Sequence, residues 1–292
     1  MLSSCLIHNG CDRSKTSFLA KLKETLQNSR IMKTALVTGA SSGIGSAFAK
    51  ALADRAYNLV LVARSQDKLE QLAATLQNKH QIQTEVIPQD LTDPHAAENL
   101  FHLVTAKEIQ IDLLVNNAGF GDYGLFAESS LDKQLEMIQL NITALTALTH
   151  LFLTPMREQG KGGIINLSSI AGFQPLPYMS IYAATKAFVL SFSEALWAEN
   201  RDAGITVTCL CPGPTETEFF KSANFPNSVT ESSQQNYATA EDVVKAALEG
   251  FDKQQANVVT GGFPNQVIVN IPRFLPREAL VSAVANQFRP NH

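Results

Sequence analysis

The sequence predicts a single α/β domain built on a doubly wound parallel sheet of about seven strands, with helices on both faces. Three observations support this fold class. Short apolar runs alternate with helical patterns of 12 or more residues, as in parallel strands that are buried on both faces. The first run leads through a glycine-rich turn directly into a helical pattern, and polar motifs follow the later runs. Because doubly wound sheets bind ligands at the carboxyl ends of their strands, these motifs predict one site along that edge.

The expected elements alternate regularly along the chain. Strands are expected at 33–38, 58–63, 84–87, 111–115, 163–167 and 205–211, with a last strand at 257–260. Helices are expected after the glycine-rich turn up to about residue 55, and then at 66–79, 94–107, 131–158, 178–201 and 240–254. Right-handed crossovers between such strands produce a sheet that is wound in both directions.

Three segments flank or interrupt this pattern. Residues 1–31 form an N-terminal extension, and Met32, directly before the first strand, is a candidate true start. The domain is expected to span 32–260. Within it, 212–237 is rich in Gly, Pro, Ser, Asn and Thr, which predicts a mobile flap over a pocket. Residues 261–292 predict a broken pair of amphipathic helices that covers the pocket or a partner subunit, with contact to a membrane surface as the less favoured alternative.

Composition excludes several classes of protein. The chain has 292 residues, 45% hydrophobic and 17% charged, so it can bury a core and is not a disordered chain. A net charge of −4 without basic blocks argues against nucleic-acid binding. No apolar run reaches the roughly 18 residues of a membrane span, and no clean signal peptide is visible, so a cytoplasmic protein without a transmembrane segment is expected. The four cysteines match neither a disulfide framework nor a metal site; Cys209 and Cys211 are expected as buried thiols, and no metal is expected.

The turn after the first strand has the spacing Gly39-x-x-x-Gly43-x-Gly45. Backbone N–H groups of such a turn can meet a pyrophosphate, whose charge the following helix N-terminus favours. A plain tight turn is the alternative, but the strand before and the helix after it favour a Rossmann-type dinucleotide site. After the second strand stand Arg64 and Ser65, where an acidic residue would select NAD. A guanidinium suits the 2′-phosphate of NADP, so NADP(H) is expected over NAD(H), with an ordinary surface arginine as the alternative.

Tyr182 and Lys186 lie four residues apart in the expected helix 178–201, and therefore one turn apart on one face. An ammonium near a phenol lowers the phenol pKa, which would make the tyrosine a usable proton donor and acceptor. Alone the pair is a weak signal, because this spacing is common on amphipathic helices. Ser168 at the preceding strand end and Asn141 in an earlier helix strengthen it, although the serine could cap the next segment and the asparagine could be an ordinary buried amide.

Together these motifs resemble the short-chain dehydrogenase/reductase family over about residues 33–255. The motifs that carry the resemblance are Thr38-Gly-Ala-Ser-Ser-Gly-Ile-Gly45, Asn116-Asn-Ala-Gly119, Asn141, Ser168, Tyr182-x-x-x-Lys186 and Pro212-Gly213. The stretch from Asn116 to Gly124 and the tail motif Phe-Leu-Pro-Arg277 resemble more narrowly the ketoacyl-reductase-like, DltE-type branch.

The resemblance implies a metal-free hydride transfer between a nicotinamide and a carbonyl or secondary alcohol. Tyr182 would protonate the carbonyl oxygen or take the hydroxyl proton, and Lys186 would lower the tyrosine pKa and hold the nicotinamide ribose. Ser168 would hydrogen-bond the substrate oxygen, and Asn141 would link Lys186 to a proton relay through water. A homodimer or homotetramer is implied as well. The implied cofactor contacts are Gly39, Ser41, Ser42, Gly43, Ile44, Gly45, Arg64, Asp90, Leu91, Asn117, Ala118, Gly119, Tyr182, Lys186, Pro212, Gly213, Thr215 and Thr217.

Thr215 is a mild departure, because the family usually has Val or Ile there. Aromatic residues and few charges surround the expected site in the sequence, which predicts an apolar, bulky carbonyl or alcohol as substrate. These aromatics, of which about half are expected to line the pocket, are Phe120, Tyr123, Phe126, Phe173, Tyr178, Phe219 and Phe220. Two other functions stay open. A non-enzymatic dinucleotide sensor would not need the proton relay, and an epimerase or dehydratase is disfavoured by the tight glycine spacing.

Overall fold

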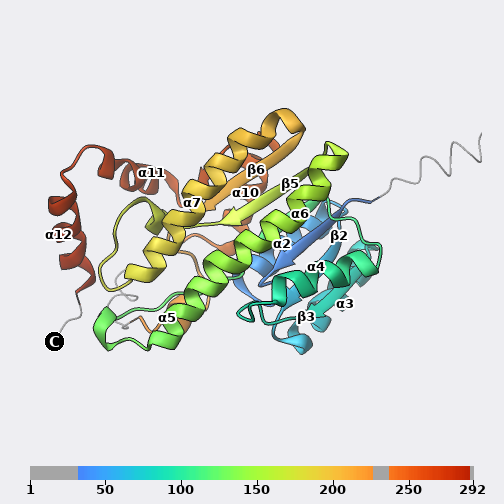
Figure 1. Cartoon of the computed structure of the whole chain (residues 1–292), viewed down its shortest axis with the longest axis horizontal. Helices are drawn as coiled ribbons and strands as arrows, with labels where there is room; N and C mark the ends of the chain where they lie inside the picture. The colour runs from blue at the N-terminus through green and yellow to red at the C-terminus, as the bar shows by residue number, and fades with distance from the viewer. Residues whose placement is uncertain (1–31, 226–236, 290–292) are drawn as a thin grey trace, which may run out of the picture. The chain divides into compact units, whose positions relative to one another are not determined.

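The computed structural model describes residues 32–225 and 237–289, and the described residues from 33 onward belong to one compact unit. The expected N-terminal extension and the centre of the expected flap therefore lie outside the described residues. The expected fold class is confirmed. A sheet of seven parallel strands has the order β3-β2-β1-β4-β5-β6-β7, and helices flank it (Figure 1). The strands are β1 (Thr34–Thr38), β2 (Asn58–Ala63), β3 (Thr84–Pro88), β4 (Leu113–Asn116), β5 (Gly162–Leu167), β6 (Ile205–Cys211) and β7 (Asn257–Val259).

Strand β1 lies inside the sheet and pairs with β2 on one side and β4 on the other, so the winding of the sheet reverses between β1 and β4. Val37, for example, is opposite both Leu61 and Val115. All of these side chains are buried, which explains why the strands read as continuous apolar runs. Cys209 and Cys211 in β6 are free and buried, as expected.

The helices form two layers. The layer of α2, α3 and α10 packs together, and α4 packs against α6 in the other layer, where α7 lies against β6. The helices are α2 (Gly43–Asp54), α3 (Gln66–His80), α4 (Ala96–Ala106), α5 (Leu131–Ile138), α6 (Leu145–Gln159), α7 (Ser180–Asn200), α8 (Phe219–Ser222) and α10 (Ala240–Asp252), with short turns η1 (Phe126–Glu128), η3 (Ile170–Phe173) and η4 (Arg201–Ala203). The principal core lies between the sheet and the layer of α4 and α6, where Leu100, Leu148 and Phe152 are almost fully buried.

The expected helix 131–158 is not a uniform α-helix. A π-helix, η2 (Gln139–Ala144), separates α5 from α6, and such wider turns often occur at functional sites. Within residues 32–225 and 237–289, the combined stretch Leu131–Gln159 is the one helix that is long and apolar enough to cross a membrane by length and composition. Its apolar character serves the core in part, because Leu148, Phe152 and Met156 are buried.

The tail forms a broken pair of helices, α11 (Gly262–Asn270) and α12 (Arg277–Phe288), joined through the turn η6 (Ile271–Arg273). Both are drawn in dark red at the left of Figure 1. Leu280 and Val284 of α12 pack into a cluster that contains Met137 and Tyr182. The tail therefore belongs to the same part of the molecule as the expected catalytic helix.

Candidate active site

The glycine-rich turn lies at the carboxyl end of β1, where the sheet reverses its winding. Gly39 has a φ of +65°, which favours glycine. A Cβ on Gly45 would lie 2.2 Å from the carbonyl oxygen of Gly39, so α2 can begin this close to the turn only without a side chain there. Gly45 thus allows the start of α2 to pack closely against the turn. The turn residues that border the adjoining cavity are Gly39, Ser41, Ser42, Gly43 and Ile44, next to the unpaired N–H groups that the start of a helix offers to an anion.

Hydrogen bonds join the residues after β4 to Thr38, the last residue of β1, directly before this turn. Thr38 Oγ1 accepts hydrogen bonds from the backbone N–H groups of Asn117 and Ala118, both at 3.0 Å. Asn117 Nδ2 donates to the carbonyl oxygen of Thr38 at 2.8 Å. The amide of Asn117 is therefore occupied by the turn itself, while Asn117, Ala118 and Gly119 all border the cavity.

Arg64 and Asp90 stand together at the far end of the cavity, after β2 and β3. Arg64 Nη1 lies 3.9 Å from Asp90 Oδ2, and the arginine side chain is 76% exposed. Asp90 also accepts hydrogen bonds from the backbone N–H and the hydroxyl of Thr92, at 3.0 and 2.8 Å. Arg64, Asp90 and Leu91 border the cavity together with Ser65. A mobile guanidinium beside a serine hydroxyl suits a phosphate group.

Tyr182 and Lys186 lie on α7, with the Lys186 Nζ 5.7 Å from the centroid of the tyrosine ring. Burial raises the pKa of Tyr182 to about 12, and a hydrogen bond with Ser169 opposes this rise. Burial lowers the pKa of Lys186 to about 8. The Nζ donates a hydrogen bond of 2.9 Å to the carbonyl oxygen of Leu167. Burial is the main influence on this phenol pKa, and the prediction that Lys186 lowers it stays a prediction.

The two serines after β5 have different partners, and the role expected of Ser168 stays a prediction. Ser168 Oγ donates a hydrogen bond of 2.7 Å to the carbonyl oxygen of Lys186, and Ser168 is only 2% exposed. Ser169 hydrogen-bonds with Tyr182 and is half-buried, and both serines border the cavity. Ser169, not Ser168, is therefore the serine beside the tyrosine.

The alternation of strand faces could have identified Ser169. Side chains two residues apart in a strand share a face, so Ser168 shares the face of Asn166. Asn166 Nδ2 donates to Ser193 Oγ of α7 at 3.0 Å. Ser168 therefore lies on the face that is turned to the helix layer, and Ser169, the next residue, is turned the other way.

Asn141 lies in the π-helix η2 and is 1% exposed. Its Nδ2 donates to the carbonyl oxygen of Phe120 at 3.0 Å and to Thr185 Oγ1 at 3.1 Å, and its Oδ1 accepts from the Phe120 N–H at 3.2 Å. A Cβ on Gly119 would lie 2.8 Å from Asn141 Oδ1 and 3.6 Å from Lys186 Nζ. Asn141 is therefore close to Lys186 but bonded to the loop after β4, and the relay through water stays a prediction.

The segment after β6 forms the opposite wall of the cavity. Thr215 Oγ1 donates to the carbonyl oxygen of Gly213 at 2.9 Å, which stabilises the turn. Pro212, Gly213, Thr215 and Thr217 all border the cavity, as does Asn265 of α11, which the sequence did not indicate. A Cβ on Gly213 would lie 2.0 Å from Asn265 Nδ2, so the tail packs directly on this turn.

These segments enclose one cavity of about 1280 Å³. The Phe219 ring lies 5.3 Å from the Tyr182 ring, between centroids, so aromatic side chains surround the catalytic end. Of the expected aromatics, those that border the cavity are Phe120, Phe219 and Phe220; those that do not are Tyr123, Phe126, Phe173 and Tyr178. Other apolar residues that border the cavity are Leu176 and Met179 before α7, Phe225 and Tyr237 of the expected flap, and Ile268 and Phe288 of the expected tail.

Comparison with known proteins agrees with this architecture. Residues 33–227 match the family model described as short chain dehydrogenase. The chain belongs to the short-chain dehydrogenase family. Relatives named very-long-chain 3-oxoacyl-CoA reductase are 38% identical over 194 residues in Anas platyrhynchos, covering 64% of this chain and 61% of that protein, and 31% identical over 249 residues in Bos taurus, covering 83% and 75%.

Solved structures of other short-chain dehydrogenases are similar over most of the chain. One from Sphingobium yanoikuyae, in complex with NADPH, has a TM-score of 0.74 at 34% identity and covers 89% of this chain and 97% of its own. The bulky-bulky ketone specific alcohol dehydrogenase from Comamonas testosteroni has a TM-score of 0.70 at 32% identity, covering 86% and 94%. Because the relatives are reductases and dehydrogenases, this short-chain dehydrogenase is an oxidoreductase. The family match ends at residue 227, before α10 and the two tail helices.

Proposed function

We propose that the chain is an NADP(H)-dependent oxidoreductase that transfers a hydride between the nicotinamide and the carbonyl or secondary alcohol of a bulky, mostly apolar substrate. The observation that carries this proposal is the position of Tyr182, Ser169 and Lys186 at one end of a cavity whose other end is the glycine-rich turn. A Cβ on Gly39 or Gly45 would collide with the turn itself or with the loop after β4. The turn therefore presents bare backbone, which fits the close approach of a dinucleotide. When bound, the nicotinamide supplies or accepts the hydride.

Side chains of the protein itself transfer the one proton that the reaction needs. With a pKa of about 12, the Tyr182 hydroxyl is protonated at neutral pH, which is the form that donates a proton to a carbonyl oxygen. Ser169 hydrogen-bonds with Tyr182 and is placed to donate to the same substrate oxygen. Lys186 is placed to hold ribose hydroxyls and to stabilise a developing phenolate.

The cofactor preference follows from the far end of the cavity. Arg64 is exposed and near Ser65, so it can pair with a 2′-phosphate, while the carboxylate of Asp90 is engaged by Thr92. The NADPH complex of the similar Sphingobium yanoikuyae protein supports the same preference. We therefore place NADP(H) above NAD(H) for this chain.

The substrate class follows from the walls around Tyr182. Phe120, Phe219, Phe225 and Phe288 border the cavity, and they favour an apolar substrate. The relatives named for a 3-oxoacyl thioester and for bulky ketones support two concrete candidates, a long-chain 3-oxoacyl thioester and a ketone with two bulky substituents.

The test is NADPH oxidation against a panel of aldehydes, bulky ketones and 3-oxoacyl thioesters, with the Tyr182→Phe variant beside wild type. Turnover should be lost in this variant, whereas NADPH affinity should stay nearly unchanged because only a hydroxyl is removed. Tyr57→Phe is a matched control, since Tyr57 is half-buried and does not border the cavity. Retained turnover in Tyr182→Phe would exclude this tyrosine as the proton donor, and NADPH binding without any turnover would favour a dinucleotide sensor.

We also propose a homodimer or homotetramer in the cytoplasm. Leu131 and Leu135 of α5 and Phe188 of α7 are 65%, 53% and 40% exposed, and such apolar positions are typical of a covered surface. The free thiols of Cys209 and Cys211 suit a reducing compartment. Light scattering coupled to size exclusion would give the mass, and a monomer at micromolar concentration would contradict the assembly.

A further inference from the structure

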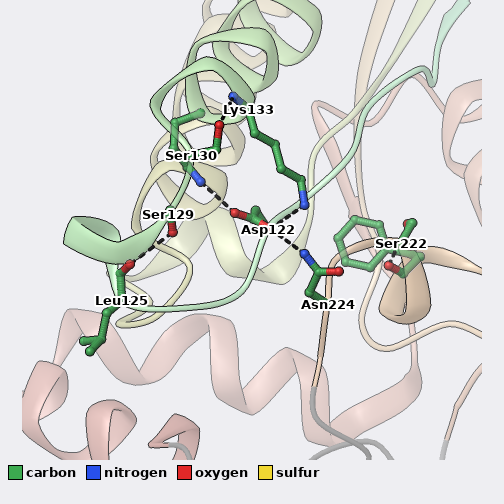
Figure 2. A network of polar contacts seen from close by, with 9 residues as sticks. Asp122, Leu125, Ser129, Ser130, Lys133, Ser222 and Asn224 are labelled. Carbon is green, nitrogen blue, oxygen red and sulfur yellow. Dashed lines mark hydrogen bonds and ion pairs between the residues drawn. The ribbon is translucent and has the colours of Figure 1, made fainter.

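The side chain of Asp122 lies between Lys133 of α5 and Asn224 of the segment after α8 (Figure 2). Lys133 Nζ donates to Asp122 Oδ1 at 2.6 Å, and Gln134 Nε2 donates to Oδ2 at 2.8 Å, both from the first turns of α5. Asn224 Nδ2 donates to Oδ1 at 3.2 Å from the segment after α8. The Asp122 side chain is only 8% exposed, so three donors from two segments converge on one buried carboxylate.

A carboxylate is suited to this position because it accepts only. Its two oxygens can face three donors at once, and Lys133, whose side chain is 31% exposed, balances the charge. An asparagine at 122 would turn an NH₂ group toward a donor. Ser130 Oγ accepts from the Lys133 N–H at 3.4 Å and caps α5, which fixes the helix turn that carries Lys133 and Gln134.

The segment that Asn224 belongs to forms the aromatic wall beside Tyr182. It follows directly on α8, whose Phe219 lies against the Tyr182 ring, and a Cβ on Gly121 would lie 2.7 Å from Phe219. Next to the carboxylate, the Tyr123 N–H donates to the carbonyl oxygen of Ala223 at 2.9 Å. The loop 120–124 is thus bonded to α5 on one side and to 219–225 on the other.

We propose that Asp122 is a positioning residue that clamps the segment 219–225 against α5 and so holds the aromatic wall in the place that orients the substrate beside Tyr182. Asp122 does not border the cavity, whereas Lys133, Phe219 and Phe225 do, so it acts through its partners. The proposal rests on the proposed function. Its consequence is that Asp122 controls how well a bulky substrate is held and leaves cofactor binding unaffected, because the glycine-rich turn is at the other end of the cavity.

The test combines kinetics with a double-mutant cycle in the full-length protein. Asp122→Ala should lower kcat/KM for a bulky ketone about tenfold, or about 1.4 kcal/mol, chiefly through KM, while the Kd of NADPH changes less than about twofold. Asn224→Ala should lower it about threefold, because Asn224 is exposed and water replaces part of its bond. Since both variants break the same contact, the double variant should be no worse than Asp122→Ala alone. Asp122→Asn is a milder change and should give a smaller loss of kcat/KM. It replaces Asp122→Ala in the test if the alanine variant does not fold.

The matched control is Asp252→Ala, which removes an ion pair with Arg55 at 3.0 Å, away from the cavity, and should leave KM unchanged. Hydrogen exchange of peptides that cover 219–225 should be faster in Asp122→Ala and unchanged in Asp252→Ala. Additive losses in the double variant, an unchanged KM or unchanged exchange would each overturn the clamp. If wild type itself reduces no carbonyl in the panel, the proposed function fails, and the hydrogen-exchange comparison still decides whether Asp122 holds the segment.

Discussion

The buried ammonium of Lys186 should make the stability of the unliganded chain depend on pH in a defined window. Burial lowers its pKa in the folded chain from the ordinary 10.5 to about 8. Between these two values the unfolded chain binds more protons than the folded chain, so the free energy of unfolding rises with pH. The cost of burying the charge is therefore full below about pH 8 and has vanished at about pH 10.5.

The magnitude follows from the size of the shift. About 2.5 pKa units at 1.36 kcal/mol each give about 3 kcal/mol across the window. Lys186→Met removes the titrating group and keeps most of the side-chain volume. Its free energy of unfolding relative to wild type should therefore fall by about 3 kcal/mol as the pH rises from 7 to 10.5. The lost hydrogen bond to Leu167 adds an offset of about 1 kcal/mol, which does not depend on pH.

The assay is urea unfolding of wild type and Lys186→Met, without cofactor, at half-unit steps from pH 7 to pH 10.5. The raised pKa of Tyr182 stabilises the folded chain below pH 10 and loses that effect only toward pH 12, and it is common to both variants. Lys50→Met, at an exposed position of α2, is the matched control for the loss of a lysine. A difference between wild type and Lys186→Met that stays constant over the window would refute the reasoning, because it would show that the ammonium is hydrated in the folded chain.

Three further predictions concern other parts of the site. Ser169→Ala should reduce kcat by about 10²–10³, whereas Ser168→Ala should stay within about tenfold of wild type; steady-state kinetics with the reverse order would restore Ser168 as the donor. NADPH should bind at least about tenfold more tightly than NADH, or about 1.4 kcal/mol, and Arg64→Ala should remove this preference; equal affinities in wild type by fluorescence titration would contradict it. Gly172→Ala should destabilise the chain by about 1–3 kcal/mol in thermal unfolding, because a Cβ would lie 2.7 Å from the carbonyl oxygen of Lys186; an unchanged Tm would show that this contact yields easily.

The sheet and the glycine-rich turn were predictable because their signals are local. A buried parallel strand such as β2 is apolar at nearly every position, and the turn at Gly39 requires glycine through its own backbone and its immediate neighbours. The interruption of the helix at η2 was not predictable in this way. There the buried amide of Asn141 bonds to the backbone of Phe120, and this contact exists only once the sheet has brought the loop after β4 to the helix.

In the candidate site, too, local features were predictable and contacts between distant segments were not. Tyr182 and Lys186 were found from spacing within one helix, whereas the choice between Ser168 and Ser169 depends on which strand face is turned to α7. The prediction that Lys186 lowers the tyrosine pKa considered charge alone and omitted desolvation, which depends on burial. Asn265 and Phe288 border the cavity from the tail, and no local pattern links them to residues more than 80 positions earlier in the sequence.

The cavity walls and the catalytic residues come from different parts of the chain, which has a consequence for how the substrate range can change. Ser169 lies between β5 and η3, and Tyr182 and Lys186 lie on α7, where Gly172 brings η3 against the backbone of α7. The walls from α8, α11 and α12 come later in the chain. Substrate range can therefore drift, or be exchanged between homologues, through the last third of the chain without rebuilding the chemistry. Chimeras joined within β6 would be a practical way to transplant one protein's substrate range onto another's catalytic half.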